Sequence, residues 1–231
     1  MSASPASTAT TRSVLVWDLP LRLFHWAFAS LIVANIVIAE FSEALKMDDP
    51  LTWHARIGYA ILTLLIFRVL WGFVGGTHAR FTSFIRGPGT ILAYLKGSGP
   101  VVGGHNPLGA LSVLALLACC LVQAVTGLFL TDEVLFEAPL YKLVDGDTAL
   151  LMAQLHDWNS KLLIVLILLH LAALLFYRVV KGERLVSAML SGRKQYPAGS
   201  AASDAQGGNL LVGIVLAALA GISVWYLVTQ V

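Results

Sequence analysis

Five long apolar runs divide the chain, separated by short segments that hold most of its polar residues. The runs cover residues 20–41, 53–74, 108–130, 155–180 and 210–228. Each is close to the roughly 20 residues with which a helix spans the hydrocarbon core of a membrane, and none shows the polar face of a helix in a soluble bundle. The pattern therefore predicts an all-α integral membrane protein with five transmembrane helices.

The composition agrees with this prediction, since 58% of the residues are hydrophobic and only 12% are charged. We expect a polar N-terminal tail at residues 1–13, a four-helix core at 14–194, a small and polar linker at 195–208, and a C-terminal transmembrane helix at 209–231. The last helix has no titratable residue except Tyr226, which predicts a peripheral place beside the core.

The charged residues are divided unequally between the two ends of the predicted helices. If successive helices alternate in direction, one side receives most of the basic residues, namely Arg12, Arg22, Arg80, Arg86, Lys96, Arg178, Lys181, Arg184, Arg193 and Lys194. The opposite loops carry the acidic residues Glu40, Glu43, Asp48, Asp49, Asp132, Glu133, Glu137, Asp145 and Asp147. By the positive-inside rule the basic side is cytoplasmic, so in a bacterial inner membrane the N-terminus is cytoplasmic and the C-terminus periplasmic. The acidic face either binds a basic partner or is simply solvated, and no nucleic-acid partner is expected.

The fourth apolar run carries His156 and His170. Fourteen residues of helix return to within about 40° of the starting face and rise about 21 Å, so both imidazoles point the same way at two depths. An ionisable side chain inside a membrane is costly and normally has a partner, a water-filled path or a cofactor. Two of them on one face predict two cofactors in one bundle.

Depth pairs these histidines with two others, because His54 lies near the outer end of the second helix and His25 in the inner half of the first. His54 and His156 form the outer pair, and His25 and His170 the inner pair. Two axial imidazoles leave haem iron with no open coordination position, which favours electron transfer. The chain lacks a Cys-x-x-Cys-His run, so we expect two non-covalent b-type haems.

Zinc or copper is the alternative metal, since imidazole binds both. The rise of about 21 Å between His156 and His170 argues against one cluster, and two sites with two histidines each would lack ligands. Haem supplies its own four nitrogen donors.

Room and counter-charge for the haems come from neighbouring residues. Gly58, one turn after His54, leaves space for a flat macrocycle, although small residues serve helix packing equally often. Arg56 at the outer level and Arg22 at the inner level are candidates to bind haem propionates. Arg68 shares the face of His54 at greater depth, and either binds a haem or extends to the cytoplasmic interface. In the third helix, Gln123 and Thr126 interrupt the apolar run in the way typical of close helix packing.

Several short motifs resemble the bacterial cytochrome b561 family, which includes the cytochrome b subunit of nickel-iron hydrogenases. The resemblance extends from about Val14 to Lys194 and is carried by the ensemble of motifs. They are Val16-Trp17-Asp18-Leu19-Pro20, Phe24-His25-Trp26, Trp53-His54-Ala55-Arg56-Ile57-Gly58-Tyr59, Phe67-Arg68 with Leu70-Trp71-Gly72-Phe73, Ala79-Arg80-Phe81, Gly87-Pro88 and Gly104-His105-Asn106-Pro107-Leu108-Gly109.

The resemblance implies a four-helix core with two b-type haems that exchanges electrons with quinone and a redox partner such as a hydrogenase, another dehydrogenase or cytochrome c. Carried over by position, its haem ligands are His25, His54, His156 and His170. A self-contained superoxide:quinone oxidoreductase is a second implied activity, and a haem-free transporter or scaffold is the alternative from another class. The cluster of Arg22, Arg68, His78 and His105 is the polar group suited to quinone proton chemistry. The motifs leave open the roles of His78, His105 and the fifth helix, and whether the chain forms a homodimer.

Overall fold

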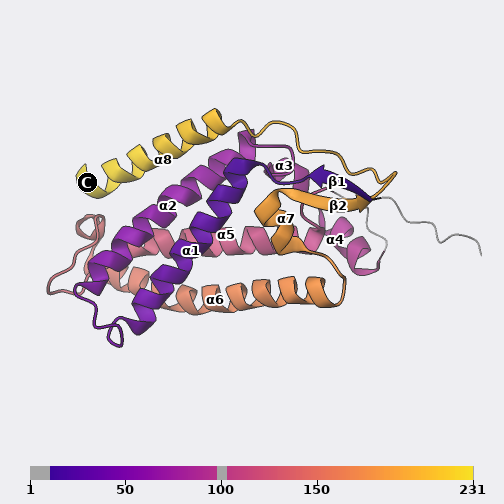
Figure 1. Cartoon of the computed structure of the whole chain (residues 1–231). Helices are drawn as coiled ribbons and strands as arrows, with labels where there is room; N and C mark the ends of the chain where they lie inside the picture. Colours follow the sequence, from indigo (N-terminus) through magenta and orange to yellow (C-terminus); the bar gives the residue numbers. More distant parts are fainter. Residues whose placement is uncertain (1–10, 98–102, 231) are drawn as a thin grey trace, which may run out of the picture.

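The computed structural model describes residues 11–97 and 103–230, and it is dominated by long helices. Within these ranges five helices are long and apolar enough to cross a membrane: α1 (Leu19–Phe41), α2 (Pro50–Val74), α5 (Pro107–Gly127), α6 (Gly146–Val179) and α8 (Leu210–Gln230). Figure 1 shows α5 and α6 running side by side, with α1, α2 and α8 inclined to them. The predicted helical membrane fold is confirmed, and the chain is a multi-pass membrane protein.

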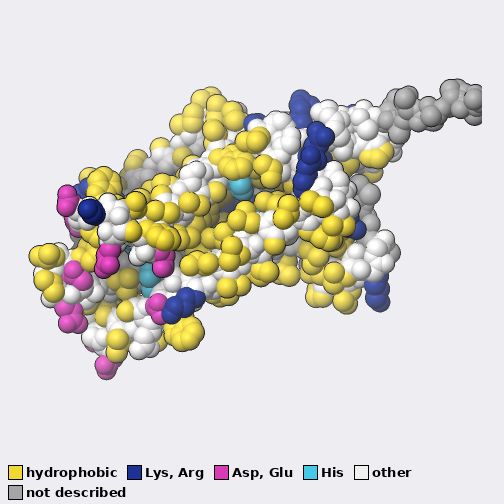
Figure 2. Space-filling view, turned by 60° about the horizontal axis from the view of Figure 1, so that its bottom comes forward, with side chains coloured by type: hydrophobic (Ala, Val, Ile, Leu, Met, Phe, Trp, Pro, Cys, Tyr) yellow, Lys and Arg dark blue, Asp and Glu magenta, His cyan; other side chains and the backbone are white. Residues whose placement is uncertain are grey.

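Shorter elements gather where the long helices are joined. At one end lie β1 (Thr11–Leu15), α3 (Phe81–Phe84), α4 (Pro88–Leu95), α7 (Leu185–Ser191) and β2 (Arg193–Pro197) (Figure 1). The other end holds the turn after α1 and the segment from Leu128 to Asp145, which contains the short 3₁₀ helix η1 (Tyr141–Leu143). Figure 2 shows acidic side chains gathered at this second end and most of the visible lysines and arginines at the first. We call the two the acidic end and the basic end.

The starts of the long helices are fixed by capping side chains. Asp18, Asp49, Asn106 and Asp145 each precede a helix and accept a hydrogen bond from a backbone N–H of its first turn. Such a side chain satisfies a donor that has no partner inside the helix. In three of the four helices a proline in the first turn adds a backbone angle already suited to the helix.

Helix α6 begins earlier than the apolar pattern predicts, at Gly146 instead of residue 155. Asp145 caps it by accepting from the N–H of Thr148 at 2.7 Å, and the residues that follow are good helix formers. The 34 residues of α6 reach about 51 Å at 1.5 Å per residue, beyond a hydrocarbon core of about 30 Å. The loop expected at 131–153 is therefore shorter, and part of α6 extends past the apolar core at the acidic end.

The four core helices pack as two pairs. Helix α1 packs on α2, α2 on α5, and α5 on α6, while α8 covers α2 and touches α1. Gly213 of α8 allows close approach to α1, because a methyl group there would lie 3.1 Å from the ring of Pro20. Helix α8 therefore lies outside the four-helix core, against α2.

A two-stranded antiparallel sheet at the basic end was not expected from the sequence. Strand β1 pairs with β2 from Thr11 opposite Pro197 to Leu15 opposite Arg193. The N–H of Ala205 also donates to the carbonyl of Leu15 at 2.7 Å. The predicted polar tail thus ends in a strand, and the predicted linker at 195–208 begins in one and folds back onto it, because each strand supplies the backbone partners the other lacks.

Asp18 joins three elements at the basic end. Its carboxylate is buried and accepts from the N–H of Leu21 at 2.8 Å, from Nε1 of Trp71 at 3.1 Å and from the N–H of Gly76 at 3.0 Å. A Cβ added at Gly208, just before α8, would lie 2.6 Å from the Asp18 side chain. The start of α1, the end of α2 and the approach to α8 therefore meet at one carboxylate.

Replacing Asp18 by alanine is expected to lower the free energy of unfolding by roughly 2–4 kcal/mol, since it removes a cap and leaves buried donors without an acceptor. Unfolding in mixed detergent micelles, followed by circular dichroism, measures the change. Asp145→Ala is the matched control: it also removes a cap, but an exposed one that accepts only from Thr148, and should cost about 1 kcal/mol. Equal losses in the two variants would show that the Trp71 and Gly76 contacts contribute nothing.

Candidate functional site

Two histidines face each other toward the acidic end. The ring centroids of His54, from the first turns of α2, and His156, from α6, lie 6.2 Å apart at an interplanar angle of 70°. Both rings are partly buried, and Nδ1 of His54 is a buried nitrogen without a hydrogen-bond partner. The predicted outer pair is thus brought together by two helices that start from the same end.

The spacing of this pair suits a metal held between the rings. Two metal–nitrogen bonds of about 2 Å, together with the radius of each ring, separate the centroids by roughly 6 Å. Among residues 11–97 and 103–230 no group of three or more His, Cys, Asp or Glu side chains could hold a metal ion. The donor set therefore fits a cofactor that brings most of its own ligands, as a porphyrin does.

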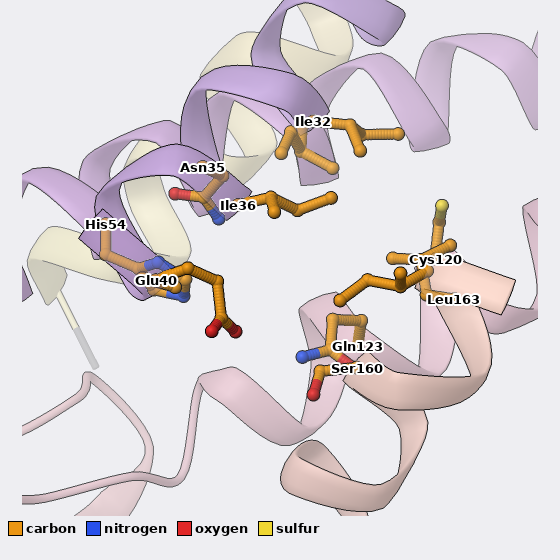
Figure 3. Close-up of a pocket in the computed structure, with 12 residues that line it drawn as sticks. Ile32, Asn35, Ile36, Glu40, His54, Cys120, Gln123, Ser160 and Leu163 are labelled. Atoms are coloured by element: carbon orange, nitrogen blue, oxygen red, sulfur yellow. The ribbon is translucent and has the colours of Figure 1, made fainter. Parts of the chain in front are cut away.

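Space for such a cofactor adjoins the pair. Two cavities of about 80 and about 180 Å³ meet at His54, and both are lined by α1, α2 and α5, with residues of α6 completing each. Figure 3 shows Asn35 and Ile36 of α1 across the smaller cavity from Gln123 and Ser160. At Gly58, which lines the larger cavity, an added Cβ would meet no atom within 4 Å. The residues present therefore leave room beside His54 where a flat macrocycle was predicted.

Helix α5 supplies a hydrogen-bond partner for His156, namely Thr126, which the sequence analysis interpreted as a helix-packing residue. The hydroxyl of Thr126 lies 3.1 Å from Nδ1 of His156, and Thr126 is buried. A Cβ at the next residue, Gly127, would lie 3.2 Å from Cε1 of the same ring. The imidazole therefore rests against α5 at two adjacent residues.

One turn after His156, the side chains of Asn159, Cys119 and Gln123 form hydrogen bonds between α5 and α6, which we call the Asn159 clasp. The amide nitrogen of Asn159 donates to the carbonyl of Cys119 at 2.9 Å and to Oε1 of Gln123 at 2.6 Å, and the thiol of Cys119 donates to Oδ1 of Asn159 at 3.1 Å. Asn159 satisfies its amide inside the membrane span this way, as a polar group in lipid must. The spacing of Cys119 and Gln123, four residues apart on one helix face, is the sequence signal that could have suggested it.

The second predicted pair lies nearer the basic end. His25 of α1 and His170 of α6 are both partly buried, and their imidazoles are close enough to interact electrostatically. Nδ1 of His25 is buried without a hydrogen-bond partner. His170 follows His156 by fourteen residues on one unbroken helix, which places the two pairs about 21 Å apart along α6.

Arg68, which is buried, and His105, which is partly buried, lie on the basic-end side of this second pair. Arg68 is 2% exposed, donates to the carbonyl of Ala79 at 3.3 Å and lies over the ring of Phe81, yet its Nη1 has no partner. His105 packs between Trp17 and Phe84, and its Nδ1 also lacks a partner. The pKa of His105 is lowered to about 3, mainly by burial and next by the positive charge of Arg68, so its ring is neutral at pH 7.

The other predicted arginines and His78 have different surroundings. Arg22 donates to the carbonyls of Met189 and Leu190 at the end of α7. Arg56 is exposed and lies over the ring of Trp53, with 5.3 Å from Cζ to the ring centroid. Nε2 of His78 lies 3.2 Å from the carbonyl oxygen of Ser203. Of the arginines proposed for cofactor binding, Arg68 is the buried one with a donor to spare.

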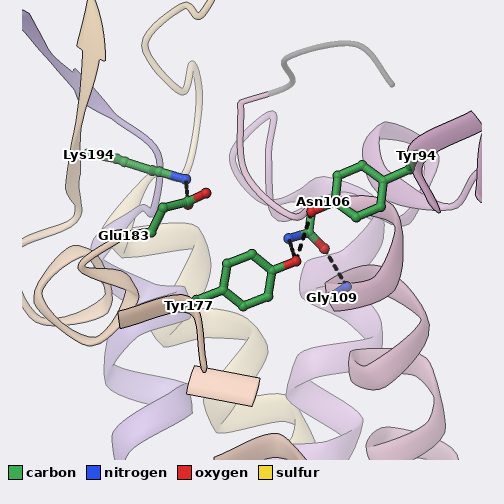
Figure 4. Close-up of polar contacts among 6 residues, drawn as sticks. All are labelled: Tyr94, Asn106, Gly109, Tyr177, Glu183 and Lys194. Atoms are coloured by element: carbon green, nitrogen blue, oxygen red, sulfur yellow. Dashed lines mark hydrogen bonds and ion pairs between the residues drawn. The ribbon is translucent and has the colours of Figure 1, made fainter. Parts of the chain in front are cut away.

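A tyrosine pair links α4, α5 and α6 at the basic end (Figure 4). The hydroxyls of Tyr94 and Tyr177 lie 2.8 Å apart, and the amide of Asn106 donates to Tyr177 at 2.9 Å. Burial and this hydrogen bond raise the pKa of Tyr94, so its hydroxyl stays protonated. An ion pair between Lys194 and Glu183, with 2.6 Å from nitrogen to oxygen, lies nearby. These contacts fix the surface helix α4 to the core beneath it.

The chain matches known proteins over most of its length. The sequence model of a family described as prokaryotic cytochrome b561 matches residues 16–192. Proteins named probable Ni/Fe-hydrogenase B-type cytochrome subunit, from Azotobacter chroococcum mcd 1 and Azotobacter vinelandii, are each 28% identical in an alignment of length 216 that covers 80% of this chain and 89% of each relative. One of the same name from Bradyrhizobium diazoefficiens is 24% identical in an alignment of length 214 that covers 80% of this chain and 87% of the relative. The family match contains both histidine pairs and ends before α8 begins.

Proposed function

The chain belongs to the prokaryotic cytochrome b561 family and transfers electrons in a membrane through b-type haem, and from this premise we propose that two haems carry electrons between the quinone pool and a redox partner. The pairing of four histidines at two levels of one bundle is the observation that carries the proposal. His54 and His156 are the axial ligands at the acidic end, and His25 and His170 those at the basic end. Haem supplies the one-electron redox chemistry, and bis-histidine ligation suits it to transfer.

Haem propionates need positive partners, and Arg68 supplies one. A guanidinium at 2% exposure with an unpartnered nitrogen is costly in an apolar bundle unless an anion lies beside it. The buried carboxylate of Asp18 is one negative charge that acts on Arg68, and the unpartnered Nη1 leaves a donor that this proposal assigns to a propionate of the haem at the basic end. Arg56 stands at the level of the other haem, and Gly58 leaves space for its macrocycle. Arg22 is close to the basic-end pair along α1, although its guanidinium is engaged by α7.

The quinone site belongs at the basic end in this proposal. Arg68, His78 and His105, with Arg22 nearby, form the polar group there, and His105 is electrostatically coupled to His25 and His170. Quinone reduction takes up protons, which needs polar side chains within reach of the haem that delivers the electrons. The basic end faces the cytoplasm by the positive-inside rule, which places this proton uptake there.

The partner side is the acidic end. The relatives are named as B-type cytochrome subunits of Ni/Fe hydrogenases, which favours a hydrogenase as the electron donor of this chain, with another dehydrogenase or cytochrome c as the alternatives. Acidic residues around the segment from Leu128 to Asp145 offer charge complementarity to a basic donor.

A haem count tests the proposal. The purified chain is expected to carry two non-covalent b-type haems with low-spin spectra, because the proposal assigns two histidines to each of two haems. A pyridine haemochrome assay measures the ratio of haem to protein. Mixing the loaded protein separately with quinol, superoxide and a reduced hydrogenase, and timing haem reduction, then identifies the donor. One haem per chain, or none, contradicts the two-level arrangement. Haems that quinol does not reduce and quinone does not reoxidise contradict the link to quinone.

A further inference from the structure

The hydroxyl of Thr126 is positioned to decide which nitrogen of His156 carries the proton. It lies 2.8 Å from the carbonyl of Val122, 3.2 Å from the carbonyl of Gln123 and 3.1 Å from Nδ1 of His156. A hydroxyl has one hydrogen to donate and two lone pairs that accept. Carbonyl oxygens only accept, and the contact with Val122 is the shortest of the three, so the hydrogen of Thr126 is assigned to that carbonyl.

The imidazole must then be the donor in the remaining contact. Since the hydroxyl hydrogen is directed along α5, the Thr126 oxygen offers His156 only a lone pair, and Nδ1 must carry a hydrogen to use it. The backbone carbonyl of Gln123 is a second acceptor beside the same ring. Both polar groups that α5 presents to His156 therefore favour the same tautomer.

We propose that Thr126 is a positioning residue that holds His156 in the tautomer protonated at Nδ1, leaving the lone pair of Nε2 free to bind haem iron. This inference rests on the proposed function and adds the control of one ligand. A ligand hydrogen bonded through its other nitrogen has a fixed ring orientation and a more basic donor atom. Gly127 supports the same seat, since a side chain there would press on Cε1 of His156.

The two ligands of this pair are therefore unequal. The ring of His54 lies beside the backbone carbonyl of Asn35, as His156 lies beside that of Gln123, but Nδ1 of His54 has no side-chain partner, whereas Nδ1 of His156 has the hydroxyl of Thr126. The Asn159 clasp keeps α5 and α6 in register beside the contact, because Asn159 lies one turn after His156 and bonds Gln123 and Cys119 of α5. Removal of the Thr126 hydroxyl should consequently affect one haem and leave the other unchanged.

Thr126→Val removes the hydroxyl and keeps the branched shape, and Thr126→Ser keeps the hydroxyl. In Thr126→Val the affinity of the acidic-end site for haem is expected to fall about 10–100-fold, measured as faster haem transfer to a haem-scavenging protein. The midpoint potential of that haem should rise, because a less basic ligand stabilises ferric iron less. Thr126→Ser should restore both values, and the other haem should keep its potential throughout.

Thr63→Val is the matched control, since Thr63 of α2 makes the same bond to a carbonyl of its own helix, to Tyr59 at 3.0 Å, and lies near Gly221 of α8. Thr63→Val should leave both haems unchanged. If the wild-type protein carries two haems, and Thr126→Val has the same midpoint potentials and the same rate of haem transfer as the wild type, the role of Thr126 is overturned and the proposed function stands. Equal shifts in Thr126→Val and Thr63→Val, or no recovery in Thr126→Ser, would overturn it as well. Wild-type protein without haem would overturn both proposals.

Discussion

Replacing His54 by alanine is expected to lower the haem content from two per chain to one. The lost component is the one at the acidic end, because His54 lies on α2 opposite His156 and the other pair is about 21 Å away along α6. Removing one of the two proposed ligands would leave the haem held by a single bond to the protein. His25→Ala should remove the other component, and a redox titration of each variant should show one surviving midpoint potential.

His78→Ala is the control for these two variants. His78 is also a histidine of the core segment, but its ring contacts the carbonyl of Ser203 and lies beside Gly103, and it is not one of the four proposed haem ligands. It should keep two haems with unchanged spectra. Loss of the same spectral component in His25→Ala and His54→Ala would contradict the pairing by depth, since the two histidines would then serve one haem.

Inserting a single alanine into α6 after Leu166 is expected to disrupt one haem site without changing the hydrophobicity of the helix. The insertion rotates His170 relative to His156 by about 100° and moves it along the axis by only about 1.5 Å. The two imidazoles can then no longer face the same side. One haem should be lost or lose its bis-histidine spectrum, while membrane insertion, measured by the yield in the membrane fraction, stays the same.

The extension of α6 provides the control insertion. An alanine after Leu150 lies between the helix start at Gly146 and His156, so it rotates only the first turns and leaves the two histidines in register. Both haems should remain. If the insertion after Leu166 also retained two bis-histidine haems with unaltered potentials, α6 would not hold both ligands and the arrangement of the site would be wrong.

The sequence by itself determined the span architecture and the histidine levels. A membrane requires a continuous apolar run of fixed length, and a helix has a fixed rise and turn, so the depth and facing of His156 and His170 follow from their spacing. His54 could be paired with His156 because both stand near helix ends on the same side. The structure places these two rings 6.2 Å apart, in accordance with that reasoning.

The local partners of those histidines depended on the tertiary structure. Thr126 reads in the sequence as a small polar packing residue, and only the approach of α5 to α6 brings its hydroxyl to His156. Arg22 and Arg68 look alike as arginines near the basic end, yet one is engaged by α7 and the other is buried with a free nitrogen. The β1–β2 sheet joins segments 178 to 186 residues apart in the chain, with Leu15 opposite Arg193 and Thr11 opposite Pro197. These features arise from contacts between distant residues, which the period of a single helix does not encode.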